Sequence, residues 1–270
     1  MDATGNPKIQ ALGRANDILD AVATAPAGTL TLAEISHQLG LKKTTCFNLA
    51  RSLVTLGFLA FDGATRRYSL GLRNVELGRK MQERFRLDEI AKPLLLRIVR
   101  EIGETVSFAI PYNFEVYIYE SVEGRYSVRA KGFAGGRYKY HSTATGRSML
   151  AYFPDAVRTA IYAAEPLVSF TPKTVTDVAM LEKQLLQIRA RGYALDLEEM
   201  ELGEHCVAVP LFDKLGSVVA AVSVSGPVSR LTPAYFATIV ENVRRESETT
   251  PLTWRPPAIS SDADSTGQMR

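Results

Sequence analysis

Residues 30–59 read LTLAEISHQLGLKKTTCFNLARSLVTLGFL and set two short helical patterns on either side of a Gly-Leu-Lys-Lys corner. Thr31, with Glu34 three positions later, matches a capping box, which predicts a helix of about eight residues that ends at Gly40. Residues 42–56 predict a longer helix, which the following glycine ends. Two short helices around so tight a corner are typical of a helix-turn-helix motif.

The longer helix has two chemically different sides. At about 100° per residue its side chains divide into two arcs. The apolar arc consists of Cys46, Leu49, Ala50, Leu53 and Val54, and the polar arc consists of Thr44, Thr45, Asn48, Arg51 and Ser52. No acidic residue occurs between Glu34 and Asp62. Acidic side chains repel phosphate, so their absence favours contact between the polar arc and nucleic acid.

A hairpin follows this helix, and another helix precedes the motif. Residues 58–71, FLAFDGATRRYSLG, predict two short strands around an Asp-Gly turn, and residues 8–26 predict the first helix. Three helices and a hairpin with two arginines make a winged helix-turn-helix, whose third helix enters the major groove while the wing follows the DNA backbone. The residues predicted to contact operator DNA are Lys42, Lys43, Thr44, Thr45, Asn48, Arg51, Ser52, Arg66 and Arg67.

The composition limits the class of protein. Its 270 residues, 46% of them hydrophobic, exceed what one core usually holds and suit two modest domains. No apolar run approaches the roughly 18 residues of a membrane span, and the chain does not open with a secretory signal. Cys46 and Cys206 lie outside any C-x-x-C pattern, which argues against a disulfide framework and a zinc site. We therefore expect a cytoplasmic protein with no membrane partner.

Charge is unevenly distributed along the chain. Residues 1–87 hold 12 Lys and Arg against 7 Asp and Glu, a surplus of +5, whereas residues 88–270 hold 20 against 22, or −2. Attraction to phosphate is the sequence-independent part of nucleic-acid binding, so the surplus favours a DNA-binding module in front of a near-neutral body. Many solvated surfaces have the same bias, and the charge alone leaves the choice open.

The remainder of the chain predicts a second, mixed domain. Strands are predicted at residues 104–110, 115–122, 125–132, 193–198, 205–212 and 217–226, with helices at 88–101, 143–153, 154–163, 176–191 and 232–246. The final residues have the Pro, Ser and Asp content of a disordered tail. The expected organisation is a DNA-binding domain, an amphipathic linker helix that packs on a partner subunit, a second domain and a tail, at residues 1–70, 71–87, 88–250 and 251–270.

Several stretches together resemble the IclR family of bacterial transcriptional regulators. Residues 30–59 and RRYSLGLRNVELG resemble that family's DNA-binding domain, while HSTATGRSMLA, RGYALDLEEMELGEHCVAVPLFD and VVAAVSVSGPVSRLT resemble its effector-binding domain. The resemblance implies an α+β chain with a GAF-like second domain, in which helices flank a central antiparallel sheet. It also implies dimers or dimers of dimers on operator DNA. Asn48 and Thr44 differ from the arginine and serine common in that family, and asparagine favours adenine where arginine favours guanine.

The resemblance also implies an effector site, and it assigns to this site Ala144, Thr145, Asp196, Cys206, Ser223 and Ser225. Ser223 and Ser225 are two positions apart on a predicted strand, so their hydroxyls face the same side. Residues 143–145 open a predicted helix, whose free N–H groups and dipole favour an anion. A helix start with two hydroxyls suits a small carboxylic acid, and Phe133 and Tyr138 ahead of it would admit an aromatic ring. In the alternative interpretation, the serines satisfy neighbouring backbone groups and Thr143 is only a helix cap.

A different class of function also fits part of the chain. In this alternative the protein is a small-molecule hydrolase that uses Ser223 or Cys206, with the N-terminal helices as an oligomerisation arm. His205 and Cys206 are adjacent on a predicted strand and point to opposite faces, so they cannot form a direct pair. The chain lacks a G-x-S-x-G elbow, a phosphate loop, a dinucleotide fingerprint and an H-E-x-x-H motif. We therefore expect a ligand-responsive DNA-binding regulator with no catalytic residues, no metal and no cofactor.

Overall fold

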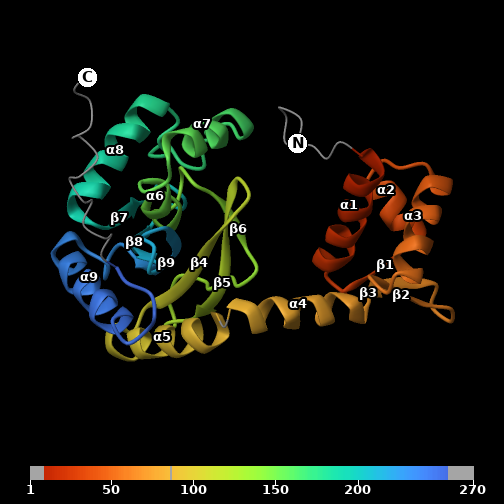
Figure 1. Cartoon of the computed structure of the whole chain (residues 1–270), viewed down its shortest axis with the longest axis horizontal. Coiled ribbons are helices and arrows are strands. Elements are labelled where there is room, and N and C mark those ends of the chain that lie inside the picture. The colour runs from red at the N-terminus through yellow and green to blue at the C-terminus, as the bar shows by residue number, and fades with distance from the viewer. Residues whose placement is uncertain (1–8, 86, 255–270) are drawn as a thin grey trace, which may run out of the picture. The chain divides into compact units, whose positions relative to one another are not determined.

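The computed structural model describes residues 9–85 and 87–254, and the chain divides into two compact units, Met1–Leu87 and Asp88–Arg270. Each unit contains its own antiparallel sheet, with three strands in the first unit and six in the second (Figure 1). The mixture of helices and antiparallel strands confirms the predicted α+β class. The two units are described separately.

The first unit is a winged helix-turn-helix domain. Its elements in chain order are α1 (Gln10–Thr24), β1 (Thr29–Thr31), α2 (Leu32–Gln38), α3 (Lys43–Thr55), β2 (Leu59–Asp62) and β3 (Arg67–Leu70). The strands form a sheet in the order β1-β3-β2, and β2 with β3 is the predicted wing. The sequence pattern does not reveal β1, because three residues are too few to show period-two alternation.

Local signals in the sequence explain the corner between α2 and α3. The Thr31 amide donates to Glu34 Oε2 at 2.6 Å and the Glu34 amide donates to Thr31 Oγ1 at 3.3 Å, so the predicted capping box is confirmed. Gly40 lies in the corner just after α2. Its φ of +60° is in the left-handed region, where residues with a side chain are strained. The three helices and the sheet then bury one small core, which consists of Ile18, Val22, Ile35, Cys46, Ala50, Leu53, Leu59 and Tyr68.

The predicted linker helix corresponds to α4 (Leu72–Phe85), which begins directly after β3. A Cβ atom on Gly71 would lie 2.1 Å from the carbonyl oxygen of Gly57, so only glycine fits at this junction. Asn74 Nδ2 donates to the carbonyl oxygens of Phe58 and Gly71 at 2.8 and 2.9 Å. These contacts attach the first turn of α4 to the base of the wing.

The second unit is built on a six-stranded antiparallel sheet in the order β6-β5-β4-β9-β8-β7. Its strands are β4 (Thr105–Tyr112), β5 (Glu115–Val122), β6 (Arg137–Lys139), β7 (Ala194–Leu197), β8 (Glu204–Phe212) and β9 (Val218–Pro227). Its helices are α5 (Leu87–Ile102), α6 (Ala144–Leu150), α7 (Asp155–Ala164), α8 (Val178–Arg191) and α9 (Pro233–Ser247). Helices α5 and α9 cover one face of the sheet, and α6, α7 and α8 cover the other (Figure 1). This arrangement confirms the predicted sheet flanked by helices.

One predicted strand is wrong. Residues 125–132 alternate like a strand, yet they form a loop, and β5 pairs instead with β6. The loop is held by polar contacts with Thr105 of β4. Thr105 Oγ1 donates to the carbonyl oxygen of Ala130 at 2.6 Å, and the amide of Gly124, just before the loop, donates to Thr105 Oγ1 at 3.1 Å. Alternation does not distinguish a paired strand from an extended loop with such anchors.

The end of the described chain lies against the second unit. Thr253 and Phe212 exchange two backbone hydrogen bonds of 2.7 and 2.9 Å, and Trp254 lies under the guanidinium of Arg244. Residues 251–254 of the predicted tail are therefore ordered, and residues 255–270 lie outside the described residues. Among the described residues, no helix is both long and apolar enough to cross a membrane.

Candidate DNA-reading surface and effector pocket

The outward face of α3 carries most of the residues predicted to contact DNA. Lys42, Lys43, Thr44, Asn48, Arg51 and Ser52 are exposed, and Thr45 is half-buried. The opposite side of the helix is fixed in the core, because Cys46 and Ala50 are fully buried. The Ser52 hydroxyl donates to the backbone carbonyl oxygen of Asn48 at 2.9 Å, and the Asn48 side chain is exposed. The exposed groups include both donors and acceptors, as base-edge recognition requires.

The two wing arginines have different surroundings. Asp62 organises the turn, since its carboxylate accepts from the Ala64 amide at 2.9 Å and from the Thr65 hydroxyl at 2.6 Å. Arg66 is exposed at this turn, with a φ of 56°. Arg67 instead donates to Thr29 Oγ1 at 2.9 Å and to the Thr29 carbonyl oxygen at 3.2 Å. Arg66 thus projects from the wing, whereas the guanidinium of Arg67 ties β3 to β1.

One exposed side chain of α3 was not among the predicted contacts. Phe47 is 45% exposed, although neighbouring Cys46 is completely buried. It lies four residues from both Lys43 and Arg51, so all three side chains follow one ridge of the helix. The helical spacing places Phe47 beside the polar arc. Its exposure could therefore have been predicted from the sequence.

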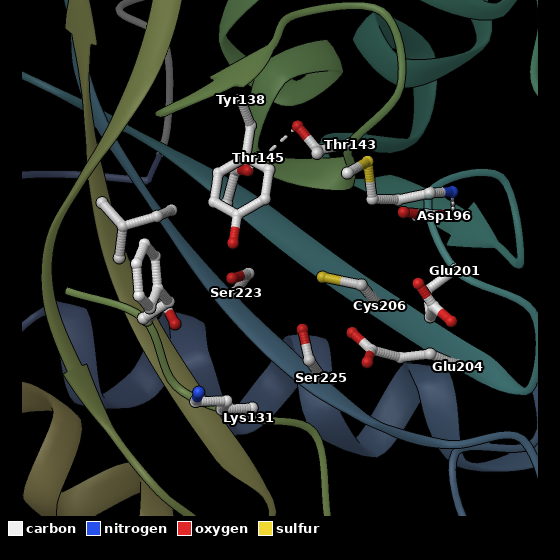
Figure 2. Close-up of a pocket in the computed structure, with 14 residues that line it drawn as sticks. Lys131, Tyr138, Thr143, Thr145, Asp196, Glu201, Glu204, Cys206, Ser223 and Ser225 are labelled. Atoms are coloured by element: carbon white, nitrogen blue, oxygen red, sulfur yellow. Dashed lines mark hydrogen bonds between the residues drawn. The ribbon is translucent and has the colours of Figure 1, made fainter. Parts of the chain in front are cut away.

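The second unit contains a cavity of about 370 Å³ lined by side chains of the sheet, of the loop before β6 and of the start of α6 (Figure 2). Of the residues assigned to the effector site by resemblance, the cavity brings together Thr145, Asp196, Cys206, Ser223 and Ser225. Ala144 does not line it, because its side chain is fully buried in the adjoining apolar core.

The register of three neighbouring strands places the central groups of the cavity. Asp196 of β7 is paired with Cys206 of β8, and Cys206 is paired with Ser225 of β9. Residues that are directly opposite in a ladder share a face of the sheet, so the three side chains stand in one row. Ser223 lies two positions before Ser225 on the same face, as predicted.

The start of α6 uses its capping residue locally. Thr143 Oγ1 accepts from the Gly146 amide at 3.0 Å, and the Thr145 hydroxyl donates to Thr143 Oγ1 at 3.3 Å. Thr143 is therefore the cap of this helix, as in the alternative interpretation, and it also lines the cavity.

Burial dominates the electrostatics of the cavity. It raises the pKa of Asp196 from 3.8 to about 6, although the Glu199 amide donates to Asp196 Oδ1 at 2.7 Å. Burial and the nearby Asp196 raise the pKa of Glu204 from 4.5 to about 7. The same two causes raise the pKa of Cys206 to about 12, so its thiol stays protonated at neutral pH. A protonated, buried thiol is a poor nucleophile.

The neighbouring histidine does not activate this thiol. His205 Nδ1 lies 2.7 Å from the carbonyl oxygen of Leu231, and its ring packs on Phe236. Its side chain points to the opposite face of the sheet from Cys206, as the adjacent strand positions predict.

Three further charged residues line the cavity and were not predicted: Lys131, Glu201 and Glu204. Glu204 could have been found, because it lies two positions before Cys206 on the same strand and hence on the same face. Lys131 and Glu201 lie in loops, and no local periodicity indicates where their side chains point.

Comparison with known proteins agrees with both units. The model of the IclR helix-turn-helix domain matches residues 11–63, and that of the bacterial transcriptional regulator IclR C-terminal domain matches residues 80–250. The HTH-type transcriptional regulator BhcR of Paracoccus denitrificans is 35% identical over 87% of this chain and 84% of its own length.

Solved structures have the same architecture. The IclR structure from Thermotoga maritima is 31% identical, covers 88% of this chain and 96% of its own, and superposes with a TM-score of 0.67. An IclR homologue from Microbacterium hydrocarbonoxydans, solved in complex with 4-hydroxybenzoate, shares the fold with a TM-score of 0.74 and 23% identity, covering 89% of this chain and 100% of that one.

The matched families and relatives are transcriptional regulators, and this finding displaces the hydrolase alternative. The chain belongs to the IclR family of bacterial transcriptional regulators and is a DNA-binding regulator rather than an enzyme.

Proposed function

We propose that this regulator acts in the cytoplasm as a homo-oligomer, a dimer or dimer of dimers, whose operator binding changes when a small carboxylic acid occupies the cavity of the second unit. The observation that carries the proposal is the row of Asp196, Cys206 and Ser225 inside a cavity of about 370 Å³. Pockets of about 300–1,000 Å³ with a few convergent polar groups are the usual form of small-molecule sites.

The lining of the cavity supports an acid as the effector. Lys131 supplies a positive charge, and the hydroxyls of Tyr138, Ser223 and Ser225 point into the same space (Figure 2). Charge-assisted hydrogen bonds from such groups hold a carboxylate well. Tyr138 and Phe133 line the cavity with aromatic rings, which suit an aromatic acid, and the Microbacterium homologue was solved with 4-hydroxybenzoate.

On the DNA side, two copies of α3 read two half-sites. The amide group of Asn48 suits a bidentate contact with adenine, while Arg66 and the lysines at the start of α3 suit phosphate contacts. Half-sites lie at fixed helical-turn separations, so operator affinity depends on the spacing of the two recognition helices.

Effector binding and DNA binding are coupled through this spacing. An acid that draws Asp196, Ser223 and Ser225 together favours one arrangement of the second unit, and α4 and α5 carry the change along the chain to the DNA-binding domain. Coupling of this kind is reciprocal, so the operator must change the affinity for the acid by the same factor.

Fluorescence anisotropy tests the proposal. Labelled DNA from just upstream of the protein's own gene is titrated with the protein at fixed salt, first alone and then with a panel of small carboxylic acids. We expect sequence-specific binding that one acid changes. In Ser225→Ala, we expect unchanged DNA affinity without the acid and no response when the acid is added. If Ser225→Ala changed the DNA affinity equally with and without the acid, the coupling would be contradicted.

A further inference from the structure

The charged groups around the cavity are separated by sign. Asp196, Glu201 and Glu204 come from the end of β7, the following turn and the start of β8. Lys131 comes from the loop between β5 and β6 and lies across Ser225 from these acids (Figure 2). It is the only Lys, Arg or His among the described residues that line the cavity. A ligand in the cavity therefore meets acids on one side and a cation on the other.

The acids have unused capacity to accept hydrogen bonds. Within residues 9–85 and 87–254, the ion pairs of the neighbouring charged side chains do not include Asp196, Glu201 or Glu204. The Glu199 and Met200 amides donate to Asp196 Oδ1, at 2.7 and 3.3 Å, and both contacts use the same oxygen. Asp196 is only 6% exposed, so water reaches it poorly once the cavity is filled. A ligand that carries its own donors gains hydrogen bonds to the carboxyl oxygens that face the cavity.

The backbone beside the opposing cation lies close to the sheet. The carbonyl oxygen of buried Ala130 accepts from Thr105 Oγ1 at 2.6 Å. A Cβ atom on Gly132 would lie 2.5 Å from Ser121 Oγ, so the chain after Lys131 also passes close to β5. The backbone on both sides of Lys131 is thus close to the sheet, and its exposed side chain lines the edge of the cavity.

We infer that the effector is a hydroxy or amino acid, bound with its carboxylate toward Lys131 and with its hydroxyl or ammonium donors toward Asp196, Glu201 and Glu204. This inference rests on the proposed function, because it specifies the class of acid for the same cavity. An acid of the same skeleton without donors leaves the set of carboxyl oxygens that face the cavity unmatched by the ligand. Such an unmatched set reduces affinity by about 10- to 100-fold.

Isothermal titration calorimetry of the purified full-length protein tests the inference without DNA. The ligands are matched sets that differ only in the donor: propionate, lactate and alanine; succinate, malate and aspartate; benzoate, 4-hydroxybenzoate and 4-aminobenzoate. We expect a donor-bearing member to bind at least about tenfold more tightly than its donor-free partner. Equal or tighter binding of the donor-free acids overturns the inference and leaves the proposed function standing. If none of the acids binds, both are contradicted.

Two substitutions separate the two sides of the cavity. Glu204→Gln should abolish the preference for the donor-bearing acid while the donor-free acid binds as before. Lys131→Met should weaken all members of a set by a similar factor. Glu241→Gln on α9 and Lys214→Met in the turn after β8 lie outside the cavity and serve as matched controls. Retention of the full preference in Glu204→Gln, with native circular dichroism, would overturn the inference.

A second inference rests on α3 and is independent of the cavity. Phe47 keeps 45% of its surface exposed on the ridge between Lys43 and Arg51, next to Asn48. An exposed phenylalanine on the DNA-reading face suits the one apolar group of the major groove, the methyl group of thymine. We propose that Phe47 contacts thymine methyl groups beside the base read by Asn48, and so selects A·T pairs.

The test uses a duplex that the protein itself selects from random-sequence DNA. Replacing the selected thymines by uracil removes only their methyl groups, and the removal of each contacted methyl group should weaken binding about fourfold. Phe47→Ala should weaken binding to the thymine duplex by a similar factor. The variant should bind the thymine and uracil duplexes equally well. Phe170→Ala, at a similarly exposed position of the second unit (43%), is the control. The assignment would be overturned if the losses of affinity from Phe47→Ala and from the uracil replacement simply add. It would also be overturned if the selected duplex has no preferred thymine.

Discussion

Arg147 of α6 is almost completely buried and forms an ion pair with Glu199 in the turn between β7 and β8. Its guanidinium also donates to the carbonyl oxygens of His141 and Leu195, at 3.1 and 2.7 Å. The Glu199 amide in turn donates to Asp196 of the cavity. One buried cation therefore connects the start of α6 with the turn that carries the acidic side of the cavity.

Arg147→Met should destabilise the second unit by about 3–5 kcal/mol, because it leaves the buried carboxylate of Glu199 without a partner. The chain has a single tryptophan, and Trp254 lies against Arg244 of this unit, so its fluorescence during urea unfolding reports the effect. The double variant Arg147→Met with Glu199→Gln should recover part of the stability. A double variant as unstable as the single one would contradict this explanation.

The stability of the second unit should fall as pH rises toward and through neutrality. The pKa of Glu204 is about 7 in the folded protein against 4.5 ordinarily, so the folded state binds more protons than the unfolded state in this range. Below pH 4.5 the Glu204 carboxyl group is protonated in both states and does not lower the free energy of unfolding. Above a pH of about 7 it is charged in both states, and the whole loss of stability is present. Glu204→Gln should remove at most about 3 kcal/mol of this dependence.

Urea unfolding of the wild type and Glu204→Gln at about pH 5 and pH 8 measures the difference. The effect of the Asp196 carboxyl group has the same sign and remains in both proteins, since its pKa is also raised by burial. Lys131 and Glu201 face the same cavity and are unchanged in the comparison. Parallel pH dependences in the two proteins would show that Glu204 is not the group that titrates.

The wing arginines should give different phenotypes. Arg66→Ala should weaken binding to all DNA sequences and reduce the salt slope by about one, without a change in stability. Arg67→Ala should lower the stability of the first unit by about 1–2 kcal/mol, because its hydrogen bonds to Thr29 link β3 to β1. Salt titrations of DNA binding and thermal unfolding followed by circular dichroism separate the two effects. Identical behaviour of the two variants would contradict the assignment.

Asn48→Ala should relax base preference. Removal of a bidentate contact with adenine costs about 1–3 kcal/mol at one base pair and leaves phosphate contacts intact. Competition between operator duplexes that differ only at that base pair should show a preference in the wild type and none in the variant. A uniform fall in affinity that keeps the preference would instead assign Asn48 to the DNA backbone.

The sequence by itself determined the elements whose signals are local. The Thr31 and Glu34 capping box, the corner glycine and the apolar arc of α3 act within a few residues of one another, so the helix-turn-helix was predictable. The same holds for β8 and β9, where alternation places Ser223 and Ser225 on one face of β9 and His205 and Cys206 on opposite faces of β8.

Only the tertiary structure decided which side chains share the cavity and which serve the fold. Residues 125–132 alternate like a strand, but a contact with Thr105 holds them as a loop, and this loop brings Lys131 to the side of the cavity opposite the acids. Thr29 captures Arg67 from a strand too short to predict. The pKa values of Asp196 and Glu204 depend on burial by distant segments. Such interactions join residues far apart in the chain, so the periodicity of neighbouring residues cannot predict them.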